Sequence, residues 1–227
     1  MSLWTRISEA LAALASGEGL SAVFEKLRTP PERTVGFTIA VIALSAKMAK
    51  ADGQVTRDEV TAFREIFHVP PEDEPAAARV FNLAREDVAG FEEYARRIAR
   101  MFDQGSEVLS DLMEGLFHIA CADGEYHPNE DQFLERVAEI FGIPAPRFNS
   151  MRARNVPDAA PDPYTVLGVE TTMSLAEIRD VYRQWVRETH PDRMQARGVP
   201  EEAVKLAESK MAAINQAWDE ISAHYGG

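Results

Sequence analysis

The sequence predicts an all-α protein, because apolar residues recur three and four positions apart through nearly every segment. Runs of β-branched residues between turn signals, which would indicate strands, are few. The chain has 227 residues, of which 45% are hydrophobic, so it is long enough for one large or two small soluble domains. We therefore expect helices that pack around a hydrophobic core.

The composition excludes several classes of function. A formal net charge of −13 argues against a general nucleic-acid surface, which needs clustered Lys and Arg. A single cysteine, Cys121, excludes a disulfide framework and a cysteine-based zinc ribbon, and it fits a reducing compartment. No stretch of about 18 apolar residues exists, and charged residues interrupt the N-terminal segment. We therefore expect a cytoplasmic protein without a membrane span or a signal peptide.

The segment 1–30 reads as two short amphipathic helices separated by Gly17-Glu18-Gly19. Their polar faces are not notably basic, as the faces of helices that lie on membranes usually are. We therefore expect them to pack on the body of the protein, with at most a peripheral membrane contact. Their apolar stripes are Leu3, Trp4, Ile7, Leu11 and Leu14, then Leu20, Val23, Phe24 and Leu27.

A repeat occupies residues 33–144. Each copy consists of an apolar helix (35–50 and 108–122), an Ala-Asp-Gly turn, and a second amphipathic helix that ends at Ile-Phe-x-x-Pro. Thr56 with Glu59 has the spacing of a capping box, and Pro128 suits a first helical turn. Residues 75–84 and 87–102 supply further helices between the copies.

The Asp-Gly turns resemble the second half of an EF-hand loop, because a glutamate follows each glycine by six residues. The first half does not fit. Its acidic positions are occupied by Met48 and Lys50 in one copy and by Ile119 and Cys121 in the other. We therefore interpret Asp52 and Asp123 as turn and cap residues.

Prolines and a lack of apolar periodicity mark residues 153–162 as a linker. The predicted organisation is therefore N-terminal amphipathic helices at 1–30, a duplicated helical domain at 31–152, this linker, and a second domain at 163–227.

The second domain reads as a hairpin of two long helices. Ser174 is a natural N-cap for the first helix, with Glu177 at the capping-box position. The two apolar stripes, once buried on each other, would fix a stiff loop with His190-Pro191-Asp192 between the helices. The stripes are Ile178, Val181, Tyr182 and Trp185 on the first helix, and Leu206, Met211, Ile214, Trp218 and Ile221 on the second.

Arginines at 179, 183 and 187 are four residues apart, so they drift only about 40° per step around the first helix of the hairpin. The alternative is a solvated helix face with intrahelical ion pairs. On an acidic chain, however, a basic ridge beside the tripeptide favours a docking face for an acidic partner surface.

Residues 162–225 resemble a complete J-domain of the DnaJ superfamily. They match its opening Pro-Tyr-x-x-Leu-Gly, its Ile-x-x-x-Tyr-Arg in helix II, and its His-Pro-Asp tripeptide. This resemblance implies docking on a DnaK-type chaperone ATPase, stimulation of its ATP hydrolysis, and capture of an unfolded client. The residues implied for this contact are His190, Pro191, Asp192, Arg179, Arg183, Arg187 and Tyr182.

The duplicated domain with its Ala-Asp-Gly turns resembles a TerB-like domain, and its union with a J-domain is similar to the DjlA group of membrane-linked co-chaperones. We expect the chain to differ from that group in lacking an N-terminal membrane span, because no apolar stretch of that length occurs in the sequence. The TerB-like domain would then give client or location specificity. Related tellurite-resistance domains hold metal through acidic clusters, which implies Asp52, Glu59, Asp123 and Glu130 as candidate metal ligands.

The sequence offers two other interpretations of its function. As an enzyme, the chain would use His190 as a general base oriented by Asp192, but the intervening proline restricts that geometry and no activated nucleophile is evident. We expect no enzymatic activity and no cofactor. The alternative to a co-chaperone is a divalent-cation-responsive adaptor, in which the TerB-like domain senses the ion and the J-domain is the output.

Overall fold

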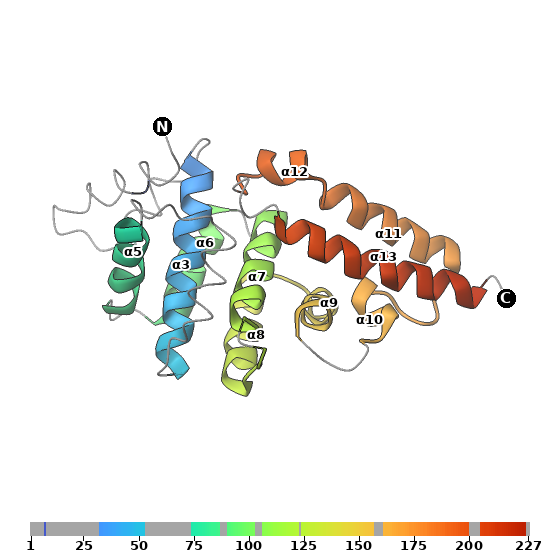
Figure 1. The fold of residues 1–227 in the computed structure, drawn as a ribbon, viewed down its shortest axis with the longest axis horizontal. Helices are drawn as coiled ribbons and strands as arrows, with labels where there is room; N and C mark the ends of the chain where they lie inside the picture. The colour runs from blue at the N-terminus through green and yellow to red at the C-terminus, as the bar shows by residue number, and fades with distance from the viewer. Residues whose placement is uncertain are drawn as a thin grey trace.

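The computed structural model describes residues 7, 32–52, 74–86, 90–102, 106–122, 124–156, 161–199 and 205–225. Within these ranges every regular element is a helix and no strand occurs, so the predicted all-α class is confirmed (Figure 1). The first helical unit contains α3 (Glu32–Asp52), α5 (Glu74–Glu86), α6 (Phe91–Met101), α7 (Glu107–Ala120), α8 (Pro128–Phe141) and α9 (Ala145–Asn155). The C-terminal unit contains α10 (Pro163–Leu167), α11 (Leu175–Glu188), α12 (Pro191–Ala196) and α13 (Lys205–Tyr225).

Helix α3 is the centre of the first unit and contacts α5, α6, α7 and α8. Its residues 35–48 are all buried, which explains why the helix is apolar on every side. Its polar side chains are satisfied locally: Ser45 Oγ donates to the Val41 carbonyl at 2.8 Å, and the Lys47 ammonium lies 4.6 Å from the centre of the Tyr94 ring. None of the described helices is long and apolar enough to cross a membrane.

The predicted N-terminal helices lie outside the described residues, with the exception of Ile7. The side chain of Ile7 is fully buried in the core of the first unit. This position of the predicted apolar stripe therefore packs on the body of the protein, as expected.

Helices α3 and α7, which are the first helices of the two predicted copies, pack against each other. The second helix of the second copy is α8, and it begins at Pro128, as predicted. Its N-cap residue His127 donates its backbone N–H to Glu130 Oε2 at 2.8 Å, and the helix ends at Gly142 in the left-handed conformation (φ 71°). The corresponding second helix of the first copy lies outside the described residues.

The C-terminal unit is a hairpin of α11 and α13 with α10 packed on α13. Ile178, Ile214 and Ile221 are fully buried between these helices, which confirms that part of the predicted stripes. The predicted capping box is present: Ser174 donates its backbone N–H to Glu177 Oε2 at 2.8 Å, and the Glu177 N–H donates back to Ser174 Oγ at 3.4 Å. The side chain of Leu206 lies outside the described residues.

The two units are in direct contact through α9 and α10. Helix α9 continues to Asn155 and therefore extends into the segment predicted as a linker at 153–162. Ser150 Oγ on α9 donates to the Val166 carbonyl at 2.6 Å, and Arg154 Nη1 donates to the same carbonyl at 3.1 Å. The last carbonyls of a helix have no donor within that helix. Two side chains of the first unit thus supply hydrogen bonds to such a carbonyl at the C-terminal end of α10.

Candidate functional site

The tripeptide His190-Pro191-Asp192 starts a helix. The sequence predicts a stiff loop between the two long helices, and this prediction is wrong for the tripeptide. Pro191 is the first residue of the short helix α12, and His190 is its N-cap. Proline suits this position because its fixed φ is already helical and its missing N–H would have no partner there. The imidazole of His190 completes the cap, since its Nδ1 accepts a hydrogen bond of 3.2 Å from the Asp192 backbone N–H.

Both polar side chains of the tripeptide remain open to solvent. The side chains of His190 and Asp192 are 59% and 88% exposed, and His190 Nδ1 lies 3.8 Å from Asp192 Oδ2. Because Nδ1 accepts a backbone hydrogen bond, a neutral ring carries its proton on Nε2. The tripeptide can therefore offer a partner one imidazole donor and one carboxylate acceptor.

Helix α11 has two faces with different roles. Arg179, Arg183 and Arg187 are all exposed. Arg183 lies 3.7 Å from Asp180, and the Arg179 guanidinium lies 5.9 Å from the centre of the Trp218 ring. At about 100° per residue, Trp185 lies on the opposite side of the helix from this ridge, and it is buried. The basic ridge therefore points away from the first helical unit.

Tyr182 is engaged within the hairpin. Its hydroxyl donates to Asn215 Oδ1 at 3.0 Å, and its ring stacks on Trp218 with 5.0 Å between the ring centres. The ring is half-buried. Its side chain thus joins α11 to α13, and a contact with a partner stays a prediction.

Of the four candidate metal ligands, only Glu130 has a side chain that the structure describes, so the metal site stays a prediction. Glu130 is buried and accepts the backbone N–H of His127, which makes it part of the α8 cap. The side chains of Asp52, Glu59 and Asp123 lie outside the described residues. Among the described residues, no group of three or more His, Cys, Asp or Glu side chains could hold a metal ion.

A largely buried network of charges joins the two units, and it was not predicted from the sequence. Helix α7 contributes three acids that are four and three residues apart in an otherwise apolar helix, which was the available signal. The cations come from α9 and from the C-terminal unit. The members are Glu107, Asp111 and Glu114 on α7, Arg147 and Arg154 on α9, and Glu188, Arg197 and Lys210 in the C-terminal unit.

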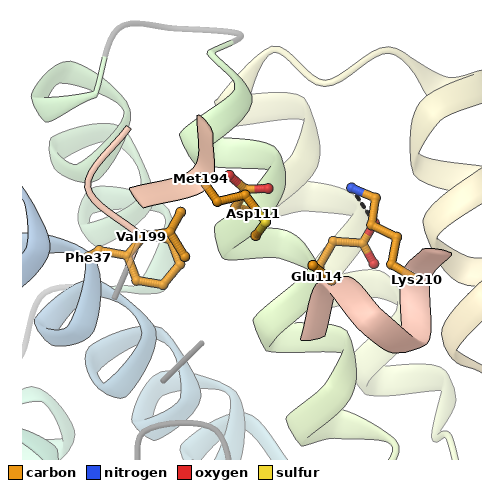
Figure 2. A pocket seen from close by; sticks show the side chains of 7 residues that line it. Phe37, Asp111, Glu114, Met194, Val199 and Lys210 are labelled. Carbon is orange, nitrogen blue, oxygen red and sulfur yellow. Dashed lines mark ion pairs between the residues drawn. The ribbon is translucent and has the colours of Figure 1, made fainter. Parts of the chain in front are cut away.

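Glu114 is the best-compensated acid of this network. Arg154 and Asn155 hydrogen-bond to its two carboxylate oxygens. The Lys210 ammonium lies 3.4 Å from Oε1, an ion pair that Figure 2 shows. Burial alone would raise the pKa of Glu114, but Arg154 and Lys210 outweigh burial and lower the pKa to about 2. Glu114 is therefore ionised at neutral pH.

Trp185 is the apolar centre of the same network. The Arg147 and Arg154 guanidinium carbons each lie 4.9 Å from the centre of its ring, and the Lys210 ammonium nitrogen lies 4.7 Å from it. Its indole Nε1 donates to the Leu167 carbonyl at 3.0 Å. Apolar periodicity predicted Trp185 in the hairpin stripe alone, whereas Trp185 also packs against cations of α9.

Asp111 contacts the segment that follows the tripeptide. Arg197 donates to Asp111 Oδ2 through Nη2 at 2.8 Å and through Nε at 3.2 Å. Burial raises the pKa of Asp111 to about 6, and Lys210 and Arg197 offset the effect only in part. Asp111, Met194 and Lys210 line one small pocket between the units (Figure 2).

Comparison with known proteins agrees with this architecture. Residues 38–153 match the family described as Tellurite resistance protein TerB, and residues 162–224 match the DnaJ domain. The co-chaperone protein DjlA of Photobacterium profundum is 27% identical in an alignment 224 positions long that spans 86% of this chain and 80% of that protein. The DjlA of Salmonella paratyphi A is 24% identical in an alignment 269 positions long, gaps included, that spans 100% of this chain and 99% of that protein.

No solved structure matches the chain. The family matches and the DjlA relatives confirm both resemblances that the sequence motifs indicated. The chain therefore belongs to the TerB family, carries a DnaJ domain after its TerB domain, and is a J-domain co-chaperone similar to the DjlA proteins.

Proposed function

We propose that this protein docks on a DnaK-type chaperone ATPase through α11 and the tripeptide, and that it stimulates ATP hydrolysis by that partner. The observation that carries the proposal is the joint exposure of the basic ridge and the tripeptide. The contacts that join the J-domain to the TerB domain are made by neighbouring side chains, such as Trp185 on α11 and Arg197 after the tripeptide. A cationic ridge steers an acidic surface into contact, and the adjacent imidazole and carboxylate then give directional hydrogen bonds.

The TerB domain supplies the client or the location in this proposal. Its described residues contact the J-domain on the buried side of α11, opposite the ridge. One molecule could therefore hold the ATPase through the J-domain and a client through the TerB domain at the same time. Such a client would be delivered at the moment of ATP hydrolysis.

The test is single-turnover ATP hydrolysis by a DnaK-type chaperone, with and without the full-length protein. We expect the wild-type protein to accelerate ATP hydrolysis. With the His190→Gln protein, the rate should equal that of the chaperone alone. The fold should persist, because the side chain contributes only an N-cap worth about 1 kcal/mol. His224→Gln is the matched control, since His224 is an exposed histidine near the end of α13. Full stimulation by His190→Gln would refute the proposal.

A further inference from the structure

One guanidinium holds both ends of the segment that carries the tripeptide. Arg197 is the C-cap residue of α12, and its Nη1 and Nη2 each donate to the Glu188 carbonyl at 3.1 Å. Glu188 is the last residue of α11. The side chain therefore closes residues 188–197 on themselves, with His190 and Asp192 inside the closed segment.

The same guanidinium also reaches the TerB domain, where it donates twice to Asp111 Oδ2 on α7. Arginine is suited to this double task, because its planar fork of donors can satisfy a carbonyl and a carboxylate together. The corner between α11 and α12 is thus tied to a helix of the other domain.

Apolar side chains on either side of Arg197 secure this contact. Met194 and Val199 are buried with the core of the TerB domain, and they share a pocket with Phe37 of α3 (Figure 2). The void that remains is about 10 Å³, which is room for about one water molecule. The chain that follows the tripeptide is therefore packed into the neighbouring domain.

Asp111 depends on Arg197 for its hydrogen bonds, because Arg197 donates both of them. Its side chain is only 4% exposed, and a buried carboxylate is costly unless it is paired and hydrogen-bonded. Lys210 lies in the same pocket and adds a favourable charge, but its ion pair is with Glu114. Loss of Arg197 would leave Asp111 without its two hydrogen bonds, so the pair should form and break as one unit.

We propose that Asp111 and Arg197 form a latch through which the TerB domain positions the His190-Pro191-Asp192 turn for its partner. Arg197 is a positioning residue, because it acts on the turn through the Glu188 carbonyl. The latch rests on the function proposed above and adds its regulation. A ligand of the TerB domain that displaced α7 would change ATPase stimulation through this pair, without touching the J-domain surface.

The test compares full-length wild-type with Asp111→Asn, Arg197→Met and the double variant. Arg136→Met is the matched control, because Arg136 is a partly exposed arginine of α8 that pairs with Glu92 and Glu139. Two readouts are used: stimulation of a DnaK-type ATPase in single turnover, and the NMR chemical shifts of the His190 ring in the protein alone. Unfolding is followed by circular dichroism.

We expect each single variant to lower stimulation about tenfold and the double variant to do no worse than the stronger single variant. The His190 ring resonances should shift in all three proteins and stay in place in Arg136→Met. If Arg197→Met fails to fold, Arg197→Lys serves instead: it keeps a cation beside Asp111 but cannot also hold the Glu188 carbonyl, and it should still lower stimulation.

Two results would overturn the latch. In the first, Asp111→Asn stimulates like wild-type and leaves the His190 resonances unchanged. In the second, Arg197→Met lowers stimulation although the His190 resonances stay in place, which would make Arg197 a direct contact of the partner. If wild-type itself fails to stimulate, the proposed function falls, and the NMR comparison alone decides on the latch.

Discussion

The guanidinium of Arg154 lies 4.9 Å from the centre of the Trp185 ring, so a side chain of the TerB domain packs directly on helix α11 of the J-domain. The same guanidinium donates to the Val166 carbonyl, and Trp185 donates to the next carbonyl, that of Leu167. Arginine and tryptophan thus cap the end of α10 together. The J-domain core and the interface between the domains share these residues. A substitution that destabilises one should therefore also destabilise the other.

Trp185→Ala should lower the free energy of unfolding by about 3–5 kcal/mol, because it removes a large buried ring from both the hairpin and the interface. Trp185→Phe keeps most of the ring contacts but loses the hydrogen bond to Leu167, so a smaller loss of about 1–2 kcal/mol is expected. Urea unfolding of the full chain measures both. Val186→Ala is the control, since Val186 is the exposed neighbour on α11. If the Trp185→Ala and Val186→Ala proteins were equally stable, the Trp185 ring would not stabilise the hairpin or the interface.

The position of Trp185 shows how far the sequence could predict the fold. Periodicity placed Ile178, Ile214 and Ile221 in the hairpin core correctly, because a helix buries one stripe whatever else it contacts. Trp185 lies only about 20° from Ile178 around α11, so periodicity also placed it correctly in that stripe. Helical spacing cannot say that a residue of the stripe meets a second surface as well, since this depends on how distant segments come together.

The interface itself was harder to predict for a related reason. The acids of α7 are visible in the sequence as three charges on one face of an apolar helix. Their partners Arg154, Arg197 and Lys210 are about 40 to 100 residues away, and no local rule pairs charges over that separation. Likewise, the proline of the tripeptide was recognised as a restraint, but its use as the first residue of α12 depends on Met194 and Val199, which fix α12 to the TerB domain.

The basic ridge leads to a prediction about affinity. Arg183 and Arg187 are exposed on α11, whereas Arg179 also lies near Trp218, so the double variant Arg183→Ala/Arg187→Ala tests charge with least effect on the fold. We expect its affinity for a DnaK-type ATPase to fall about tenfold at about 0.05 M salt and less at about 0.3 M salt, because salt screens exposed charges. Titration calorimetry at both concentrations is the measurement.

Arg136→Ala on α8 is the control for that experiment, since it removes a similar charge from a surface of the TerB domain. Its affinity should match that of wild-type at both salt concentrations. If the double variant bound the ATPase as tightly as this control, the basic ridge would not be part of the docking surface.

Glu114→Gln should destabilise the protein strongly. The substitution leaves the buried cations of Arg154 and Lys210 without their shared carboxylate, which typically costs about 3–5 kcal/mol. Because the pKa of Glu114 is lowered to about 2, this contribution is fully present above about pH 4.5 and is lost as the pH falls towards about 2. Chemical unfolding at neutral pH measures it, with Glu139→Gln on the exposed side of α8 as the control. The interpretation fails if the two variants are equally stable.

Asp111 should make the stability of the protein depend on pH in the opposite direction. Its folded pKa of about 6 lies above its ordinary value of 3.8, so the folded state takes up a proton as the pH falls below about 6, before the unfolded state does. The free energy of unfolding therefore rises by about 1–2 kcal/mol as the pH falls from about 7 to about 5. The Asp111→Asn protein has no carboxyl at this position, so it should not show this rise.

The measured quantity for Asp111 is the difference in unfolding free energy between wild-type and Asp111→Asn at these two pH values. Glu114 does not titrate in this window, because its pKa is about 2, and Arg197 and Lys210 stay charged throughout it. Subtraction of the variant cancels the other acids and histidines of the chain. At the lower pH, the free energy of unfolding of the wild-type protein should rise relative to that of the variant. A difference that is the same at both pH values would mean that Asp111 keeps an ordinary pKa, and that its burial against Arg197 is fully compensated.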